Sequence, residues 1–200
     1  MLPLKDNVPT AGVPVVTIGV IVLSVGIHLA GWEPDLSDLA WPWAALASLL
    51  LGVSLLGVAI NMLFLWLFGE SLEGLLGPGR FLALLVVAGI AAAGAQELAD
   101  PETAVPSVGI AGSIAGLIGA YALILPRARM LCWVLIPFFV TFVEIAAPIL
   151  AAVWLALQAI PDVGQPPVAG LLGGIAVGVV AGWLLARGRS AAAERPQAAP

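Results

Sequence analysis

The stretch VPSVGIAGSIAGLIGAY, Val105–Tyr121, says most about how this chain folds. Its glycines Gly112, Gly116 and Gly119 recur at spacings of four and three residues, so they share one face of a helix. Most of the other residues are apolar. A small-residue face on an apolar helix is typical of helices that pack closely inside a membrane. We therefore predict a membrane-spanning helix from Ile110 to Leu125.

The composition of the whole chain supports a membrane protein. Of its 200 residues 62% are hydrophobic and 10% are charged, and the mean hydropathy is +1.12. These values exclude an ordinary soluble domain. A bilayer core is about 30 Å thick, so each spanning helix needs about 20 mostly apolar residues. We expect an all-α, polytopic membrane protein with six transmembrane helices, from Val13 to Ala30, Trp43 to Phe68, Phe81 to Ala95, Ile110 to Leu125, Ala147 to Ile160 and Val168 to Ala186.

The segments outside the expected spans complete the domain organisation. Residues 1–12 are predicted to be a cytoplasmic N-terminal segment, 13–187 the membrane domain, and 188–200 a disordered tail. No small-residue cleavage site follows the first apolar segment, so we expect this segment to be retained as a span. Met130 to Glu144 contains Pro137 and is predicted to be an interfacial segment on the cytoplasmic side.

The charged residues separate between the two sides of this topology. All basic residues fall at expected termini or turns of one side: Lys5, Arg80, Arg127, Arg129, Arg187, Arg189 and Arg195. The loops of the other side carry only acids: Glu33, Asp35, Asp38, Glu97, Asp100, Glu102 and Asp162. The positive-inside rule then places both termini in the cytoplasm. We expect a protein of the plasma membrane or a bacterial-type inner membrane.

Composition also bounds the cofactors and partners. Cys132 is the single cysteine, which excludes an internal disulfide and a multi-cysteine metal site. No phosphate-binding loop or metal-binding motif is present, so no cofactor or metal is expected. The net charge of −5 argues against binding to nucleic acid. Membrane lipid is the first expected partner.

Segments along nearly the whole chain resemble the rhomboid intramembrane serine proteases. They are MLPLKDNVPT, NMLFLWLFGESLEGLLGPGRFL (Asn61–Leu82), Val105–Tyr121, PRAR (Pro126–Arg129), TFVEIAAPILAAVWLALQ (Thr141–Gln158) and VAG…AGWLLARG (Val168–Gly188). The resemblance implies six helices around a water-filled cavity that opens toward the extracytoplasmic face. It also implies a catalytic serine at the start of the fourth helix, a histidine on the sixth, and an asparagine and a histidine on the second that help to hold the oxyanion.

The catalytic positions that the resemblance implies are not intact. The family usually reads Gly-x-Ser-Gly where this chain has Gly109-Ile110-Ala111-Gly112, so the nucleophile position is Ala111. The histidine position falls at Gly173 or at Ile175, depending on which end of the sixth helix is aligned. The histidine positions of the second helix fall at Gly57 and Gly52, and only Asn61 remains of the oxyanion group.

Ser113, two residues after Ala111, is a weak candidate for a substitute nucleophile. Two residues turn a helix by about 200°, so Ser113 points to the face opposite Ala111. A serine also needs an adjacent base, and the single histidine, His28, lies near the outer end of the first helix. We interpret Ser113 as a packing residue that hydrogen-bonds its own helix backbone. His28 is interpreted as an interfacial residue, with a proton-sensing role left open.

The glycine faces of two helices are present although the catalytic residues are not. We predict that the fourth and sixth helices pack against each other through Gly112, Gly116, Gly119, Gly174, Gly178 and Gly182. The resemblance then suggests a pseudoprotease that binds the transmembrane helices of client membrane proteins. Three alternatives stay open: an active intramembrane serine endopeptidase with an unrecognised dyad, a pathway for a small polar solute or ion, and a structural membrane subunit.

Overall fold

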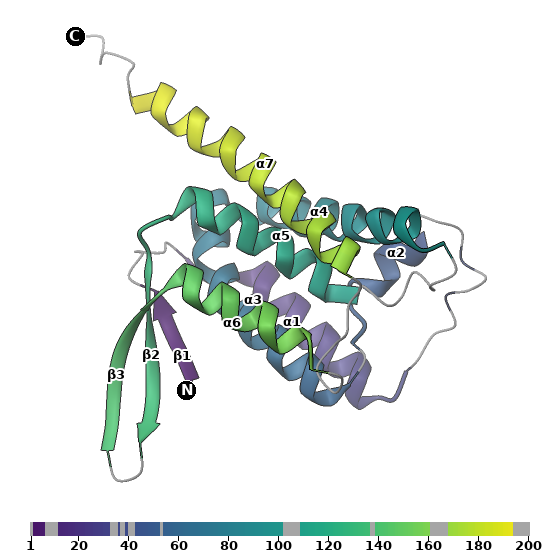
Figure 1. Cartoon of the computed structure of the whole chain (residues 1–200), viewed down its shortest axis with the longest axis horizontal. Helices are drawn as coiled ribbons and strands as arrows, with labels where there is room; N and C mark the ends of the chain where they lie inside the picture. Colours follow the sequence, from purple (N-terminus) through teal and green to yellow (C-terminus); the bar gives the residue numbers. More distant parts are fainter. Residues whose placement is uncertain are drawn as a thin grey trace.

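A computed structural model describes residues 2–6, 12–32, 36, 39, 43–52, 54–101, 109–136, 139–160 and 168–193. Helices make up the body of the protein, and three strands lie at one end of it (Figure 1). In chain order the elements are β1 (Leu2–Asp6), α1 (Val15–Leu29), α2 (Trp43–Ser48), α3 (Leu55–Leu76), α4 (Pro78–Ala99), α5 (Gly109–Ile124), β2 (Arg129–Ile136), β3 (Phe139–Ala146), α6 (Ala147–Gln158) and α7 (Val168–Ala193).

The predicted helical membrane fold is confirmed. Within the described residues, three helices are long and apolar enough to cross a bilayer, namely α3, α4 and the Val168–Arg187 part of α7, with mean hydropathies of 1.7, 1.9 and 2.2. The apolar helices α1, α5 and α6 are shorter. The bounds of α5 and α6 lie within two residues of those predicted. α7 continues to Ala193, beyond the boundary at which the disordered tail was expected to begin.

The predicted second span, Trp43 to Phe68, is wrong because the structure divides it. α2 ends at Ser48, and α3 begins at Leu55. The break is stabilised by Ser54, whose backbone is extended and whose Oγ accepts a hydrogen bond from the Gly57 N–H at 3.0 Å. A serine in this role satisfies one of the amide groups that a helix leaves unpaired at its start.

α3 also continues beyond the expected stop at Gly69 and Glu70. A methyl group at Gly69 would lie 2.8 Å from the Thr17 hydroxyl, so the glycine lets α1 approach α3 closely. The helix ends instead at Gly77, whose φ of +79° suits glycine. Pro78 then starts α4 at a position where its missing N–H costs no hydrogen bond.

The segment Met130 to Glu144, predicted to be interfacial, is an antiparallel hairpin. β2 pairs with β3 from Arg129 opposite Ala146 to Ile136 opposite Phe139. β1 pairs with β2 on its other side, so the N-terminal strand closes a three-stranded sheet of order β1-β2-β3. The hairpin extends away from the helices (Figure 1).

α5 lies at the centre of the helical core. All of its residues from Gly109 to Tyr121 are buried, and α7, α4 and α3 pack around it. Aromatic rings join α3 and α5: the ring centroids of Phe68 on α3 and Tyr121 on α5 are 5.0 Å apart in an edge-to-face arrangement. Such pairs stabilise a core beyond the area that they bury.

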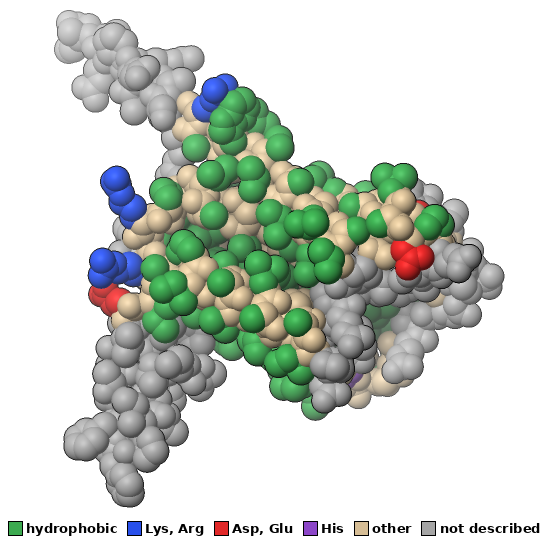
Figure 2. Space-filling view, in the orientation of Figure 1, with side chains coloured by type: hydrophobic (Ala, Val, Ile, Leu, Met, Phe, Trp, Pro, Cys, Tyr) green, Lys and Arg blue, Asp and Glu red, His purple; other side chains and the backbone are tan. Residues whose placement is uncertain are grey.

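Charged side chains mark the two ends of the helical body. We call the end with Arg80, Arg127 and Arg187 the basic end, and the end with Glu97 and Asp100 the acidic end. Figure 2 shows basic side chains on the side where the sheet lies, an acidic group on the opposite side, and apolar side chains between them. An acid at the basic end, Glu144, forms an exposed ion pair with Arg129 at 3.4 Å.

Candidate functional site

The closest backbone approach in the core joins α5 and α7. A methyl group on a glycine of α7 would strike a carbonyl oxygen of α5 at three places: Gly174 at Gly112, Gly178 at Gly116, and Gly182 at Ala120. Both partners advance by four residues from one contact to the next, so the two helices run parallel. A methyl group on Gly119 would in turn lie 2.7 Å from the Ile175 oxygen. Five of the six predicted packing glycines thus lie against the other helix, and Gly112 supplies a contacting carbonyl.

The start of α5 holds the position expected for a nucleophile. Gly109 has a φ of +46°, and a methyl group there would lie 2.8 Å from the Leu51 carbonyl oxygen. Glycine therefore lets α5 begin against the chain that follows α2. Two residues later Ala111 is 5% exposed and belongs to the central hydrophobic core. The site presents a methyl group where a serine would present a hydroxyl.

The two positions proposed for the base differ in their surroundings. A methyl group on Gly173 would lie 2.6 Å from the Ala95 side chain and 2.9 Å from the Ala91 carbonyl, so this position faces α4 rather than α5. Ile175 is half-buried, and its carbonyl oxygen faces Gly119. Gly173 therefore does not face Ala111, and Ile175 offers only an aliphatic side chain packed against the core.

Leu171 is the residue that sequence reasoning missed. It precedes Gly174 by three residues, which places it on the face of α7 that packs against α5. Its side chain is 8% exposed and lies in the same hydrophobic core as Ala111. The sequence held a signal for Leu171. Gly174 and Gly178 define one face of the helix, and the residue three positions before Gly174 lies on the same face. The side chain on this face of α7 near the start of α5 is therefore aliphatic.

Ser113 is held by a neighbouring helix. Its Oγ donates a hydrogen bond to the Leu85 carbonyl oxygen of α4 at 2.9 Å, and the side chain is 1% exposed. The expectation that Ser113 bonds its own helix backbone was wrong, because α4 passes close enough at Gly89 to offer an acceptor. The hydroxyl faces α4.

Asn61 connects α3 to α6. It is 5% exposed, and its Oδ1 accepts a hydrogen bond from the Trp154 indole Nε1 at 3.2 Å. The Phe64 ring packs beside the same indole, with centroids 6.4 Å apart. At Gly57 and Gly52 no side chain is available to donate a hydrogen bond. The amide oxygen of Asn61 is thus occupied by α6.

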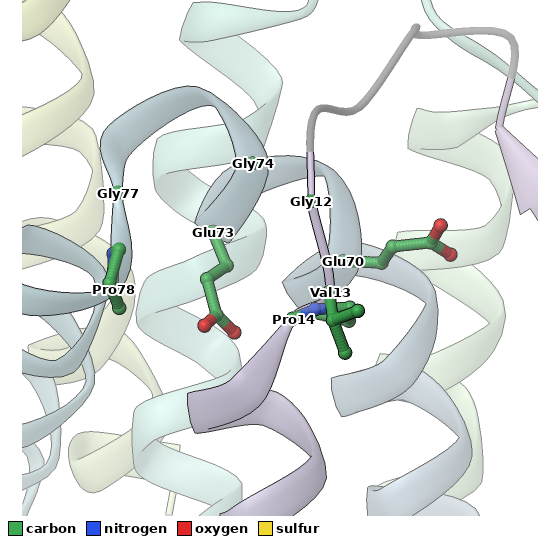
Figure 3. A pocket seen from close by; sticks show the side chains of 8 residues that line it. All are labelled: Gly12, Val13, Pro14, Glu70, Glu73, Gly74, Gly77 and Pro78. Carbon is green, nitrogen blue, oxygen red and sulfur yellow. The ribbon is translucent and has the colours of Figure 1, made fainter.

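A cavity of about 90 Å³ lies elsewhere, between the start of α1 and the end of α3. Figure 3 shows the Glu73 carboxylate directed toward the first turn of α1, with Glu70 directed away. This cavity is near the basic end, whereas Ala111 is near the acidic end. No cluster of three metal-binding side chains occurs among the described residues. His28 lies in the last turn of α1.

Comparisons of the sequence with known proteins give consistent matches. The Rhomboid domain family model matches residues 39–188. The mitochondrial Rhomboid protein 1 of Saccharomyces cerevisiae is 31% identical over 134 residues, 65% of this chain and 38% of that protein. The Rhomboid protease GluP of Bacillus subtilis is 36% identical over 78 residues, 39% and 15% of the two chains. The Rhomboid protease GlpG of Pectobacterium atrosepticum is 31% identical over 104 residues, 48% and 37%. The chain therefore spans less than two fifths of each relative.

Proposed function

We propose that this chain, which belongs to the rhomboid family of membrane proteins, lacks peptidase activity and binds transmembrane helices of other membrane proteins. The observation that carries the proposal is the buried methyl group of Ala111 at the start of α5. A serine hydroxyl becomes a nucleophile only when a base takes its proton. Here the hydroxyl is missing, and the facing position on α7 is Leu171.

Peptide cleavage is the competing function, because two of the relatives are named proteases. It would require Ser113 to act as the nucleophile. The Ser113 hydroxyl is buried and donates to Leu85, and the single histidine of the chain, His28, lies on α1. Removing one member of a catalytic unit costs nearly as much as removing all of it, so the geometry favours an inactive protein.

We expect no cleavage of a fluorescent transmembrane substrate by the wild-type protein in proteoliposomes, and no change with Ser113→Ala. The double variant Ala111→Ser with Leu171→His should give at most trace cleavage, because Gly52 and Gly57 supply no side-chain donor and one such donor is worth about 10²–10³ in rate. Gly173→His in place of Leu171→His should give none, since that position faces α4. Wild-type cleavage that Ser113→Ala abolishes would contradict the proposal.

The packing of α6 supports helix binding. Only Ala147, Leu150, Trp154 and Gln158 of its twelve residues are buried, so the helix contacts the body through one narrow face. An element with so few buried contacts separates more readily than α5, whose first thirteen residues are all buried. Separation of α6 from α3 would open the helical core sideways to the lipid and to other helices.

Site-specific crosslinking in native membranes tests this binding. A photoreactive amino acid at Val153, an exposed residue next to Trp154, should crosslink to membrane helices of other proteins. The same group at Val22, an exposed residue of α1, is the matched control. Equal crosslinking to lipid alone at both positions would refute helix binding.

We also propose that the basic end is cytoplasmic, from the positions of the arginines. With Cys132 replaced by serine, a cysteine at Asp100 should react with an impermeant maleimide added outside intact cells, and a cysteine at Arg127 should react only after lysis. Both side chains are exposed. The reverse labelling pattern would invert the proposed topology.

A further inference from the structure

Gln158, the last residue of α6, has a carboxamide without a hydrogen-bond partner in the part of the chain that the structure describes. The residue is 2% exposed, and both its Oε1 and its Nε2 are unpaired. Nearly all buried polar side-chain atoms in native proteins have a partner, and an unpaired group is costly to bury. A fully unpaired amide in a membrane core therefore requires a physical explanation.

Gln158 lies on the face of α6 that packs against the core. The buried residues of α6 recur every three or four positions, and Trp154 on this face reaches Asn61 of α3. α6 starts at the basic end, where the Ala147 N–H bonds the Ala128 carbonyl oxygen. α3 ends there, so the two helices are antiparallel. Gln158 thus lies one turn, about 6 Å, beyond Trp154 toward the acidic end.

On the described helices beside α6, the residues at this depth have no polar side chain, and the other buried glutamine with an unpaired oxygen, Gln96, lies on α4. Helix geometry places Gly57 and Val58, which precede Asn61 by about one turn, at the level of Gln158 on α3. Ala111 lies near the same end on α5. None of the three has a polar side chain. None of these three residues can therefore pair with the Gln158 carboxamide in the part of the chain that the structure describes.

We propose that Gln158 selects bound transmembrane helices by hydrogen-bonding to a polar side chain in their extracytoplasmic half. The ligand is the uncharged amide or hydroxyl of Asn, Gln, Ser or Thr, since a carboxamide offers both a donor and an acceptor to such groups. Hydrogen bonds of this kind hold helices together in lipid. The inference rests on the proposed function of helix binding, and it deepens that function by naming the recognised group.

Binding of two synthetic peptides to the full-length protein in liposomes tests the inference. Each peptide is a single leucine–alanine span with a fluorescent label, and the two differ by one asparagine or leucine in the extracytoplasmic half. The wild type should bind the asparagine peptide about three- to tenfold more tightly. Gln158→Met should remove this preference while still binding both peptides. Gln96→Met, at a buried glutamine of α4 that is 3% exposed, should retain it.

The outcomes separate the inference from the proposed function. Equal binding of both peptides by the wild type would overturn the inference and leave helix binding intact, whereas binding of neither would overturn both. A preference for the asparagine peptide that survives Gln158→Met would overturn the role of Gln158, and this is the result expected if a water molecule is its only partner. An equal loss of the preference in Gln96→Met would overturn it as well. Because it removes an unpaired polar group, Gln158→Met should keep or raise the melting temperature. A lower value would reveal an internal partner and overturn the inference.

Discussion

Gly178→Ala should strongly destabilise the protein, although it adds a single methyl group. The added carbon would overlap the Gly116 carbonyl oxygen and would lie 2.7 Å from the Gly116 carbonyl carbon and 2.9 Å from its Cα. All three are backbone atoms, so no side chain can rotate away, and α5 and α7 must separate. Overpacking of a core typically costs 1–3 kcal/mol. We expect a loss at the upper end, about 3 kcal/mol of unfolding free energy, measured by denaturant titration in bicelles.

Gly26→Ala is the matched control for this prediction. Gly26 lies within α1, and a methyl group there meets no atom within 4 Å. Alanine favours a helix over glycine by about 0.5–1 kcal/mol, so this variant should be as stable as the wild type or slightly more stable. Equal destabilisation by both substitutions would show that the contact between α5 and α7 is not what makes Gly178 sensitive.

The packing of α5 and α7 could be anticipated because small residues repeat with the helical period. The pairing of individual residues across the two helices could not, since it depends on how far one helix is shifted along the other. Gly173 and Ile175 were inferred by alignment from either end of the sixth expected span. Leu171 emerges only once Gly174 is known to lie against Gly112. Periodicity defines a face, whereas the shift between helices is a tertiary property.

The hairpin and the break before α3 could not be predicted from hydropathy. β2 and β3 are apolar at consecutive positions and lack the alternation that identifies a strand. The pairing of β2 with β1 joins residues more than 120 positions apart. Ser54 before an apolar run does signal a helix start. Hydropathy alone does not reveal this helix start, because the residues before and after the break are equally apolar.

Glu73 illustrates the same limit for polar residues. The sequence places it just after Gly69 and Glu70, where a membrane helix was expected to end in solvent. In the structure it is 4% exposed and lies within α3. Hydropathy treats a carboxylate near the end of a span as a solvated group, whereas here the start of another helix surrounds it.

Glu73→Ala should be the second strongly destabilising substitution. The carboxylate accepts hydrogen bonds from the Val16 N–H at 2.8 Å, the Thr17 N–H at 2.9 Å and the Thr17 hydroxyl at 2.8 Å. α1 begins after Pro14 without a side-chain cap of its own. Glu73 therefore serves as the cap from α3, and its negative charge also interacts favourably with the N-terminal end of the α1 dipole.

The expected loss follows from the donors that the alanine variant leaves behind. Hydrogen bonds to a charged group contribute about 1.5–3 kcal/mol each, and they are not additive. With the acceptor gone, three donors near the start of α1 lose their partner, so we expect Glu73→Ala to lower the unfolding free energy by about 3 kcal/mol or more.

Glu73→Gln keeps the size of the side chain but turns an amide NH₂ toward these donors, and should lose nearly as much unfolding free energy. Glu70→Gln, one turn earlier, is the control: its carboxylate is directed away from α1 (Figure 3) and makes none of these three hydrogen bonds, so this substitution should cost less than Glu73→Gln. If Glu73→Gln were as stable as Glu70→Gln in the same titration, the charge of Glu73 would have no part in holding α1 to α3.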